Sequence, residues 1–490
     1  MKTATYNPPV EPRFRGGAKD ESGNALMFTV VLTGIIGLIL ASYLTLVQSQ
    51  NGANARSQSW NSSMPVVEAG IEDAMAHLNR NGTTNGSLLS DGWIATPGGY
   101  AVTRALAEGF YTATIMNYTS GAALNSPTIE SKGYVPMPRL LAGVQAGGGL
   151  PYLAAAGGSI TTYLGRGVRV RTVPDFIFTK GIVARDSLDL NGNGIRTDSY
   201  DSTDPTASTN GLYSADRARD KGDIAVNSSL TNSLNVGDAM IYGHVSVGPG
   251  GSIDIGSSGS IGSTNWHLAG NTGVEGGWTK NDMNVSFPDV QAPFIGGTFT
   301  PAGGWITNTT PGGFLVATLY DYILDDGDFA KDILRGSVYV RGNARLYVTS
   351  ELEIQALAMA PDKSISIYCA APSASITGAD AVNGDGTADK LAFWGLPSCT
   401  SVSLNGTASF TGTVYAPNAD LTIERNSHGS GSGSVDFNGA AIARRARLRG
   451  NLQVHYDEAL ARRGPFRGYI ARSWNEMSAA DVPVLTVAMP

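Results

Sequence analysis

Residues Ala25 to Val47 read ALMFTVVLTGIIGLILASYLTLV, a run of 23 residues without a charged side chain. The uncharged window around this run extends from Ser22 to Ala55. An α-helix needs about 20 mostly apolar residues to cross the hydrocarbon core of a bilayer. Thirteen of the 23 residues are Leu, Ile, Val or Phe, and at roughly −0.3 to −0.6 kcal/mol each they contribute about −4 to −8 kcal/mol to insertion. The stretch therefore predicts a membrane-spanning helix near the N-terminus.

The segment before the apolar run is hydrophilic and basic, with Lys2, Arg13, Arg15 and Lys19. Basic residues beside a membrane helix favour the cytoplasmic side. The charge distribution therefore predicts a cytoplasmic N-terminus, a single membrane crossing, and export of the chain from about residue 56 onward.

Three kinds of segment fit an apolar run at this place. A cleaved secretory signal is supported by the small residues of Ala53-Asn54-Ala55, but its apolar core is normally only about 7 to 15 residues long. A plain single-pass anchor and a pilin-like N-terminus both accommodate the full length. The pilin-like form requires a hydrophilic leader, a Gly before the cleavage point, and a long apolar helix after it.

Two stretches carry a family resemblance. Glu21-Ser22-Gly23-Asn24-Ala25-Leu26 stands before the apolar run, and Ser63-Met-Pro-Val-Val-Glu-Ala-Gly-Ile-Glu-Asp-Ala74 follows it. Both resemble the N-terminal region of PilX-type minor pilins and related pseudopilins. The resemblance implies cleavage between Gly23 and Asn24, and a non-enzymatic subunit of a type IV pilus or a type II secretion pseudopilus. It also implies contacts with other pilins through the N-terminal helix. The expected location is the bacterial inner membrane, with the bulk of the chain in the periplasm or at the cell surface.

One residue departs from the pilin pattern. Major pilins carry Glu at the fifth position after the cleavage point, and here that position is Phe28. This departure argues against a self-polymerising major subunit, and it fits either an atypical minor subunit or a chain whose leader is not cleaved. A body of about 400 residues is also hard to pack repeatedly along a thin filament, so we expect it at or near the tip.

Apolar residues at spacings of three and four predict that an amphipathic helix follows the membrane segment. These residues are Val67, Ile71, Ala74, Met75 and Leu78. Gly52 and Pro65 are expected to interrupt the helix, and Asn81-Gly82 to end it. Small residues at Thr33, Gly37 and Ala41 form a row that would let another helix approach closely; small residues are also simply common in membrane helices.

The rest of the chain predicts a mainly β protein. Short alternating segments are separated by Gly, Asn, Ser and Thr, and Arg341-Gly-Asn-Ala-Arg-Leu346 is echoed by Arg449-Gly-Asn-Leu-Gln-Val454. Such repeats suit a β-solenoid, although a β-sandwich shows similar alternation. The expected division is a leader (1–23), a transmembrane and amphipathic helix (24–80), a pilin-like β region (82–180), a Gly-rich solenoid-like domain (181–458) and a C-terminal tail (459–490).

Composition narrows the possible partners. The net charge of −7 gives no basic surface for nucleic acid.

The two cysteines, Cys369 and Cys399, could pair outside the cytoplasm, closing a loop of about 30 residues and adding about 3 kcal/mol of stability. Two separate buried thiols are the alternative.

One segment resembles the first half of a calcium-binding loop. Asp189, Asn191 and Asn193 supply oxygen ligands at positions 1, 3 and 5, Gly194 follows, and Asp198 lies shortly after. This spacing predicts a modest calcium site made of Asp189, Asn191, Asn193 and Asp198. An Asn-Gly turn between two strands explains the same residues without a metal.

Catalytic motifs are absent from the sequence, which has no HExxH, GxSxG or P-loop pattern. We therefore expect no enzymatic activity.

Arg445, Arg447 and Arg449 share one face of a predicted strand, either as a solvated face or as a surface for a polyanion. A membrane-tethered β-solenoid enzyme acting on polysaccharide and a surface adhesin remain alternatives to the pilin-like subunit.

Overall fold

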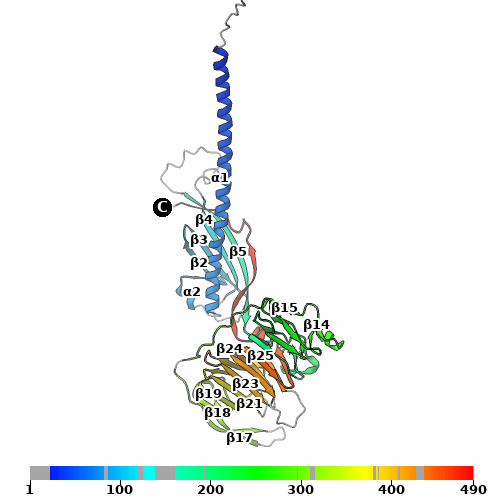
Figure 1. The fold of residues 1–490 in the computed structure, drawn as a ribbon. Helices are drawn as coiled ribbons and strands as arrows, with labels where there is room; N and C mark the ends of the chain where they lie inside the picture. Colours follow the sequence, from blue (N-terminus) through cyan, green and yellow to red (C-terminus); the bar gives the residue numbers. More distant parts are fainter. Residues whose placement is uncertain are drawn as a thin grey trace, which may run out of the picture. The chain divides into compact units, whose positions relative to one another are not determined.

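The computed structural model describes residues 22–81, 86–118, 125–137, 160–192, 194–294, 296–309, 315–378, 382–383, 386–406, 409–425 and 435–488. The chain forms two compact units. Unit 1 comprises residues 1–173 and 471–490, and unit 2 comprises residues 174–470. Strands dominate both units behind one long N-terminal apolar helix, which confirms the mainly β class (Figure 1).

Unit 1 contains α1 (Ser22–Asn81), the short helix α2 (Gly86–Ser90) and a sheet of order β1-β2-β3-β4-β5-β27, with β28 also paired to β5. The pairs from β1 to β5 are antiparallel. The strands are β1 (Ile94–Thr96), β2 (Gly99–Leu106), β3 (Gly109–Met116), β4 (Thr128–Pro136), β5 (Ile160–Phe176), β27 (Phe466–Glu476) and β28 (Leu485–Ala488). An antiparallel sheet thus lies in the region where the sequence predicts a pilin-like β region.

Helix α1 packs on β3 and β4 of this sheet, and Figure 1 shows it lying along them. Strand β3 alternates between buried and half-buried residues, with Tyr111, Ala113 and Ile115 buried. This alternation is expected for a strand with one face on the core. The helix is continuous through Pro65, so the predicted interruptions at Gly52 and Pro65 are wrong. Burial of Val66 and Val67 beside the proline offsets the hydrogen bond that Pro65 cannot donate.

Unit 2 is inserted into the sheet of unit 1. The chain leaves that sheet through β5 and returns through β27, which pairs with β5. After β27 the chain forms β28, which pairs antiparallel with β5 along Leu485–Ala488. The segment 459–490, expected only as a tail, therefore supplies two strands to unit 1.

Unit 2 consists mainly of short strands, and Figure 1 shows several of them, among them β18, β19, β21 and β23, in a stack. Its strands are β6 (Ile182–Asp189), β7 (Arg196–Tyr200), β8 (Ile224–Val226), β9 (Leu234–Gly237), β10 (Met240–Tyr242), β11 (Val245–Val247), β12 (Ile253–Ile255), β13 (Ser260–Gly262), β14 (Gly273–Val274), β15 (Thr279–Lys280), β16 (Ala302–Thr309), β17 (Leu315–Leu324), β18 (Gly327–Val340), β19 (Ala344–Met359), β20 (Ile365–Cys369), β21 (Ser373–Gly378), β22 (Leu391–Gly395), β23 (Ser401–Gly406), β24 (Phe410–Arg425), β25 (Val435–Arg449) and β26 (Leu452–Asp457). Its helices are η2 (Ala215–Arg217), α4 (Thr264–Leu268), η3 (Ala388–Lys390) and α5 (Leu460–Arg463).

The strands of unit 2 pair mainly in parallel. One row of paired residues crosses nine strands, and every member is an apolar residue buried in the core. The row is Phe329, Leu346, Ile367, Phe393, Val414, Ala441, Ile182, Ile224 and Val245. Because each residue lies beside its counterpart on the paired strand, the nine strands together bury one continuous apolar row. The pairings of β19, β20, β22, β24, β23 and β21 close into a parallel ring.

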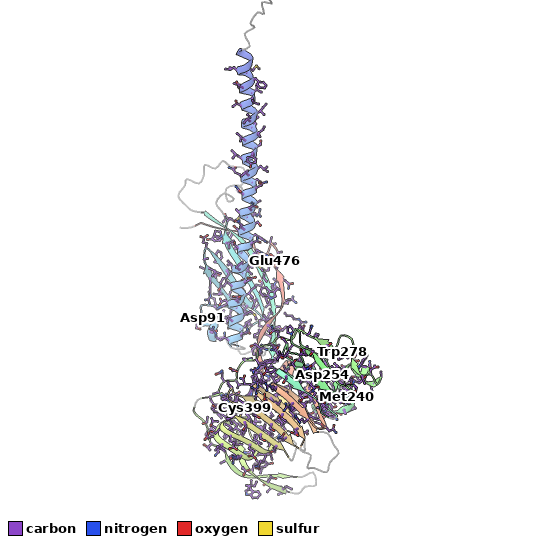
Figure 2. All side chains as sticks on the ribbon, viewed as in Figure 1. Asp91, Met240, Asp254, Trp278, Cys399 and Glu476 are labelled. Carbon is purple, nitrogen blue, oxygen red and sulfur yellow. The ribbon has the colours of Figure 1, made fainter. Side chains whose placement is uncertain are left out.

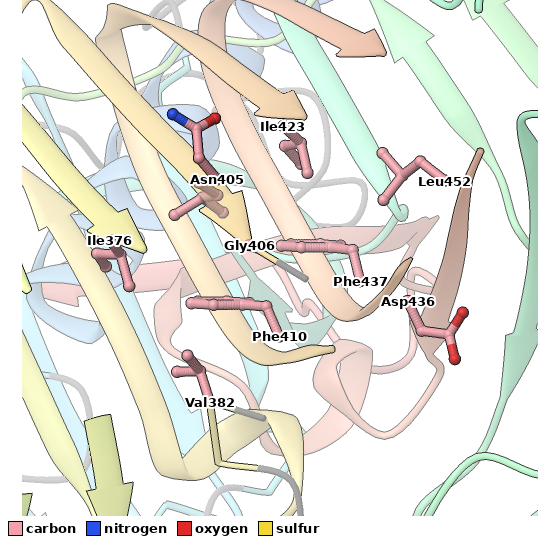
Figure 3. A pocket seen from close by; sticks show the side chains of 10 residues that line it. Ile376, Val382, Asn405, Gly406, Phe410, Ile423, Asp436, Phe437 and Leu452 are labelled. Atoms are coloured by element: carbon pink, nitrogen blue, oxygen red, sulfur yellow. The ribbon is translucent and has the colours of Figure 1, made fainter. Parts of the chain in front are cut away.

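The interior of unit 2 where β24 meets β25 is tightly packed. The rings of Phe410 and Phe437 stack with centroids 5.5 Å apart and parallel planes, and Figure 3 shows them beside Ile376 and Ile423. The cavity around them has a volume of only about 20 Å³, which is enough for roughly one water molecule. This interior is a core and not a ligand site.

The chain does not follow the stack from one end to the other. Strand β6 lies in its middle, between β8 on one side and β25 on the other. Residues 182–280 extend the stack in one direction. Residues 281–294 then return along its outside, where the Met283 amide donates to Val247 O (3.0 Å) and the Tyr415 hydroxyl donates to Pro288 O (2.8 Å). The second half of unit 2 begins at β16 and coils back until β25 meets β6.

Candidate functional site

The first half of α1 is an uncovered apolar surface. Its most apolar 18-residue window has a mean hydropathy of 2.4, and none of that window is buried by the rest of the chain. Its large side chains are 46–71% exposed from Leu26 to Leu46. Exposed apolar surface on this scale needs lipid or another apolar partner. The helix is long and apolar enough to cross a membrane.

The threonine hydroxyl groups within this apolar segment are satisfied by the helix itself. Thr29 Oγ1 donates to Leu26 O (2.8 Å), Thr33 Oγ1 to Thr29 O (2.7 Å) and Thr45 Oγ1 to Ser42 O (2.7 Å). An unpaired hydroxyl in hydrocarbon costs several kcal/mol, so these bonds make the segment compatible with a bilayer or with a bundle of helices.

The predicted helix-packing row lies on this open surface. Thr33, Gly37 and Ala41 are all exposed, and a Cβ built on Gly37 meets no atom within 4 Å. The row is available for another helix, and its role in helix contact stays a prediction. Gly23 and Asn24 lie in the first turn of α1, whereas residues 1–21 of the leader lie outside the described residues.

The second half of α1 is fixed to the sheet of unit 1. Val67, Ile71, Ala74 and Leu78 are buried and Met75 is half-buried, as the amphipathic spacing predicts. Two contacts show how closely the helix approaches β4, and both depend on the small residues of that strand. Ser131 Oγ donates to Val67 O (2.8 Å). A Cβ on Gly133 would lie 2.7 Å from Val67 N and 2.9 Å from Ser63 O, so only glycine fits at this crossing.

A polar cluster fixes the C-terminal end of the helix. Asp73 accepts a hydrogen bond from the Tyr111 hydroxyl (3.0 Å), and its carboxylate lies 3.1 Å from Arg104 Nε. Burial and the bond with Asp73 raise the pKa of Tyr111 to about 12. One turn further, His77 Nδ1 lies 2.7 Å from Ser87 Oγ, and its Nε2 lies 3.4 Å from the Asp91 carboxylate, which is labelled in Figure 2. Sequence patterns do not indicate this cluster, because Asp73 and His77 of α1 meet Arg104, Tyr111 and Asp91 only in the folded structure.

The predicted disulfide partners are neighbours in unit 2. Cys369 ends β20, Cys399 lies in the next turn (labelled in Figure 2), and both are buried free thiols. The neighbouring Cys399 thiol and burial raise the pKa of the Cys369 thiol. The fold therefore brings the two sulfurs together, and their oxidation to a disulfide stays a prediction.

Among the predicted calcium ligands that the structure describes, Asp189 and Asp198 contact different partners. Asp189 accepts hydrogen bonds from the Asn191 amide and Asn235 Nδ2 (both 3.2 Å), and its other oxygen lies 3.7 Å from Arg447 Nε. Asp198 is fully buried among different partners. Asn193 lies outside the described residues. Among the described residues there is no group of three or more His, Cys, Asp or Glu that could hold a metal ion. Calcium binding through Asp189 and Asn191 stays a prediction.

Asp198 belongs to a buried polar cluster that the sequence did not indicate. Its Oδ1 lies 2.5 Å from His455 Nδ1, and its Oδ2 accepts from the Tyr213 hydroxyl (3.0 Å) and lies 3.2 Å from Arg196. The ring of Tyr213 stacks on that of His455 at 3.5 Å. Burial opposes protonation of His455, but its hydrogen bond with Asp198 and the nearby Asp436 carboxylate outweigh this effect and raise its pKa. The ion pair joins β7 to β26, and complete burial of His455 keeps it from any polymeric substrate.

Arg445 and Arg447 of β25 are exposed but have acidic neighbours. Arg447 lies 3.7 Å from Asp189, and Arg445 Nη1 lies 3.9 Å from the Asp420 carboxylate. These contacts fit a solvated strand face with mixed charges.

Comparisons with known proteins add one family match. Residues 322–463, from the end of β17 to α5, match a family model described as a domain of unknown function (DUF7305). No curated protein sequence matches the chain. Among solved structures, the competence-associated pilin ComZ from Thermus thermophilus is similar, at 11% sequence identity and a TM-score of 0.28 over 84% of this chain and 97% of that one. At this TM-score the similarity establishes neither a shared fold nor a shared function.

Proposed function

We propose that this protein is a non-enzymatic, pilin-like subunit of a type IV pilus or a type II secretion pseudopilus. The observation that supports it best is the division of α1. One half is apolar and uncovered, and the other half is packed on an antiparallel sheet in the same continuous helix. A simple anchor needs no rigid connection between its membrane segment and the folded body. A subunit that moves from a bilayer into a bundle of helices needs this rigid connection. Its apolar half must remain covered, and its folded body must move together with the helix.

The inserted unit 2 supports a position at or near the filament tip. Its residues 174–470 form a large body that would obstruct regular packing if every subunit carried one. Phe28 stands where major pilins carry a carboxylate, and its side chain is 69% exposed. Both features fit a minor subunit that joins a filament once and presents unit 2 at its end.

We also propose that residues 181–458 form a β-solenoid. The in-register parallel rows of buried apolar residues support this interpretation, because each turn covers the apolar side of the next. An experimental structure in which the turns do not repeat at the ~4.8 Å spacing of paired strands would contradict it.

Mass spectrometry of the mature N-terminus tests the pilin-like role. We expect the protein from its native membrane to begin at Asn24 with a methylated amine, and Gly23→Ala to retain Met1. Gly34→Ala, which places its Cβ in open space, is the matched control and should be processed normally. A wild-type protein that retains Met1 would remove the main support for this function and leave a single-pass anchor.

The predicted topology has a separate test. A reporter that is active only in the cytoplasm should be silent when it is fused after Pro490. Activity at that position would reverse the assigned orientation of the chain.

A further inference from the structure

The hairpin formed by β16 and β17 has one exposed apolar face. Its antiparallel register places Trp305 opposite Leu319 and Thr309 opposite Leu315. Directly paired residues project to the same side of a hairpin, so Trp305, Leu315 and Leu319 lie on one face. These three side chains are 67%, 74% and 57% exposed. On the opposite face Ile306 is only 8% exposed, and Val316 is 48% exposed.

The hairpin extends beyond the stacked turns. Strand β18 pairs with β17 only at Tyr322–Leu324. Among the described strand pairings, residues 315–320 of β17 pair only with β16. A two-stranded hairpin is marginally stable by itself in water, and the apolar face formed by Trp305, Leu315 and Leu319 has no cover from the described parts of the chain.

The sequence of this region is free of charge. No Asp, Glu, Lys, Arg or His occurs from Val290 to Tyr320. The neighbouring strands differ, because their exposed faces carry ion pairs such as Arg345–Asp328 and Arg335–Glu351. The lack of charge is therefore a property of the hairpin region and not of the outer surface of unit 2.

We propose that the hairpin docks on the lipid surface of a second membrane, distinct from the bilayer that holds α1. Surfaces that bind other proteins usually have a polar and partly charged rim. Surfaces that enter lipid lack charged residues, because each charge in hydrocarbon costs free energy. Trp is the side chain that favours the boundary between headgroups and acyl chains. An open hairpin cannot span a bilayer, because its outer edges carry unpaired backbone groups, so it lies shallowly in the interface. The second membrane rests on the proposed function, in which unit 2 is presented away from the anchoring bilayer.

A vesicle-capture experiment tests the proposal with the full chain. The protein is reconstituted through α1 into immobilised proteoliposomes, and protein-free fluorescent vesicles of phosphatidylethanolamine and phosphatidylglycerol are added. We expect wild-type proteoliposomes to capture these vesicles and Ala317→Lys, which puts a charge in the centre of the apolar face, to lower capture at least tenfold. Thr318→Lys adds the same charge on the opposite face of the same strand and should retain capture.

A second readout locates the contact. Brominated acyl chains in the captured vesicles should quench part of the tryptophan fluorescence, and Trp305→Phe should remove that quenching. Equal capture by the wild type and Ala317→Lys, or no capture by either, would overturn the proposal. Clustering of proteoliposomes without added vesicles, lost in Ala317→Lys, would show instead that the face binds a second copy of the chain. None of these outcomes depends on cleavage after Gly23, so they are separable from a failure of the proposed function.

Discussion

The crossing of α1 over β4 at Gly133 predicts a large effect from one methyl group. In Gly133→Ala the new Cβ would lie 2.7 Å from Val67 N and 2.9 Å from Ser63 O. Both are backbone atoms of the helix, so no side chain can rotate away and the helix itself must shift. That shift also stretches the buried hydrogen bond from Ser131 to Val67 O.

The cost follows from two terms. Overpacking of a core costs about 1–3 kcal/mol, and a weakened buried hydrogen bond adds about 1 kcal/mol. The reduced flexibility of the unfolded chain offsets about 1 kcal/mol of this cost. We therefore expect a net destabilisation of unit 1 by about 1–3 kcal/mol, which corresponds to roughly 5- to 150-fold in an opening equilibrium.

Hydrogen exchange measured by mass spectrometry resolves this effect within the full chain. Peptides covering residues 63–78 should lose about 5- to 150-fold of their protection in Gly133→Ala, and peptides from unit 2 should remain unchanged. Gly86→Ala, whose Cβ meets no atom within 4 Å, is the control and should keep wild-type protection. Unchanged protection of residues 63–78 in Gly133→Ala would refute the packing of α1 on β4.

Three further predictions concern unit 2. The pKa of His455 is raised in the folded state, so its stabilising contribution is complete below about pH 6.5 and is lost as the pH rises through the folded-state pKa. Urea titrations should show this decline in the free energy of unfolding. His455→Gln should remove the pH dependence and cost about 3 kcal/mol at pH 6. Oxidation of Cys369 and Cys399 should stabilise unit 2 by about 3 kcal/mol, so reduction should lower the Tm of the exported protein, and identical melting in Cys369→Ser would show that no disulfide forms. Millimolar calcium should raise the Tm by binding at Asp189; the rise should vanish in Asp189→Ala, and its absence in the wild type would identify an ordinary turn.

The local features of the fold could be predicted from the sequence. The apolar run and the spacing from Val67 to Leu78 depend on residues within a few turns of one helix, and both indicate the observed helix. The continuity through Pro65 could not be predicted, because it depends on packing against β4, which is distant in the sequence. The same limit applies to His455 and Asp198, which are 257 residues apart and meet only because β26 pairs with β7.

The insertion of unit 2 between β5 and β27 also bears on how such proteins diversify. Because these two strands pair with each other, the entry and exit points of the insert lie roughly one strand spacing apart, about 5 Å. A short turn could join them and leave the host sheet complete, as sites that accept inserted domains require. Unit 1 could therefore accept an unrelated inserted domain at this position without changes to its own core. Exchange of the insert would be a direct evolutionary route to new surface properties, and an engineer could use the same junction to display a chosen domain.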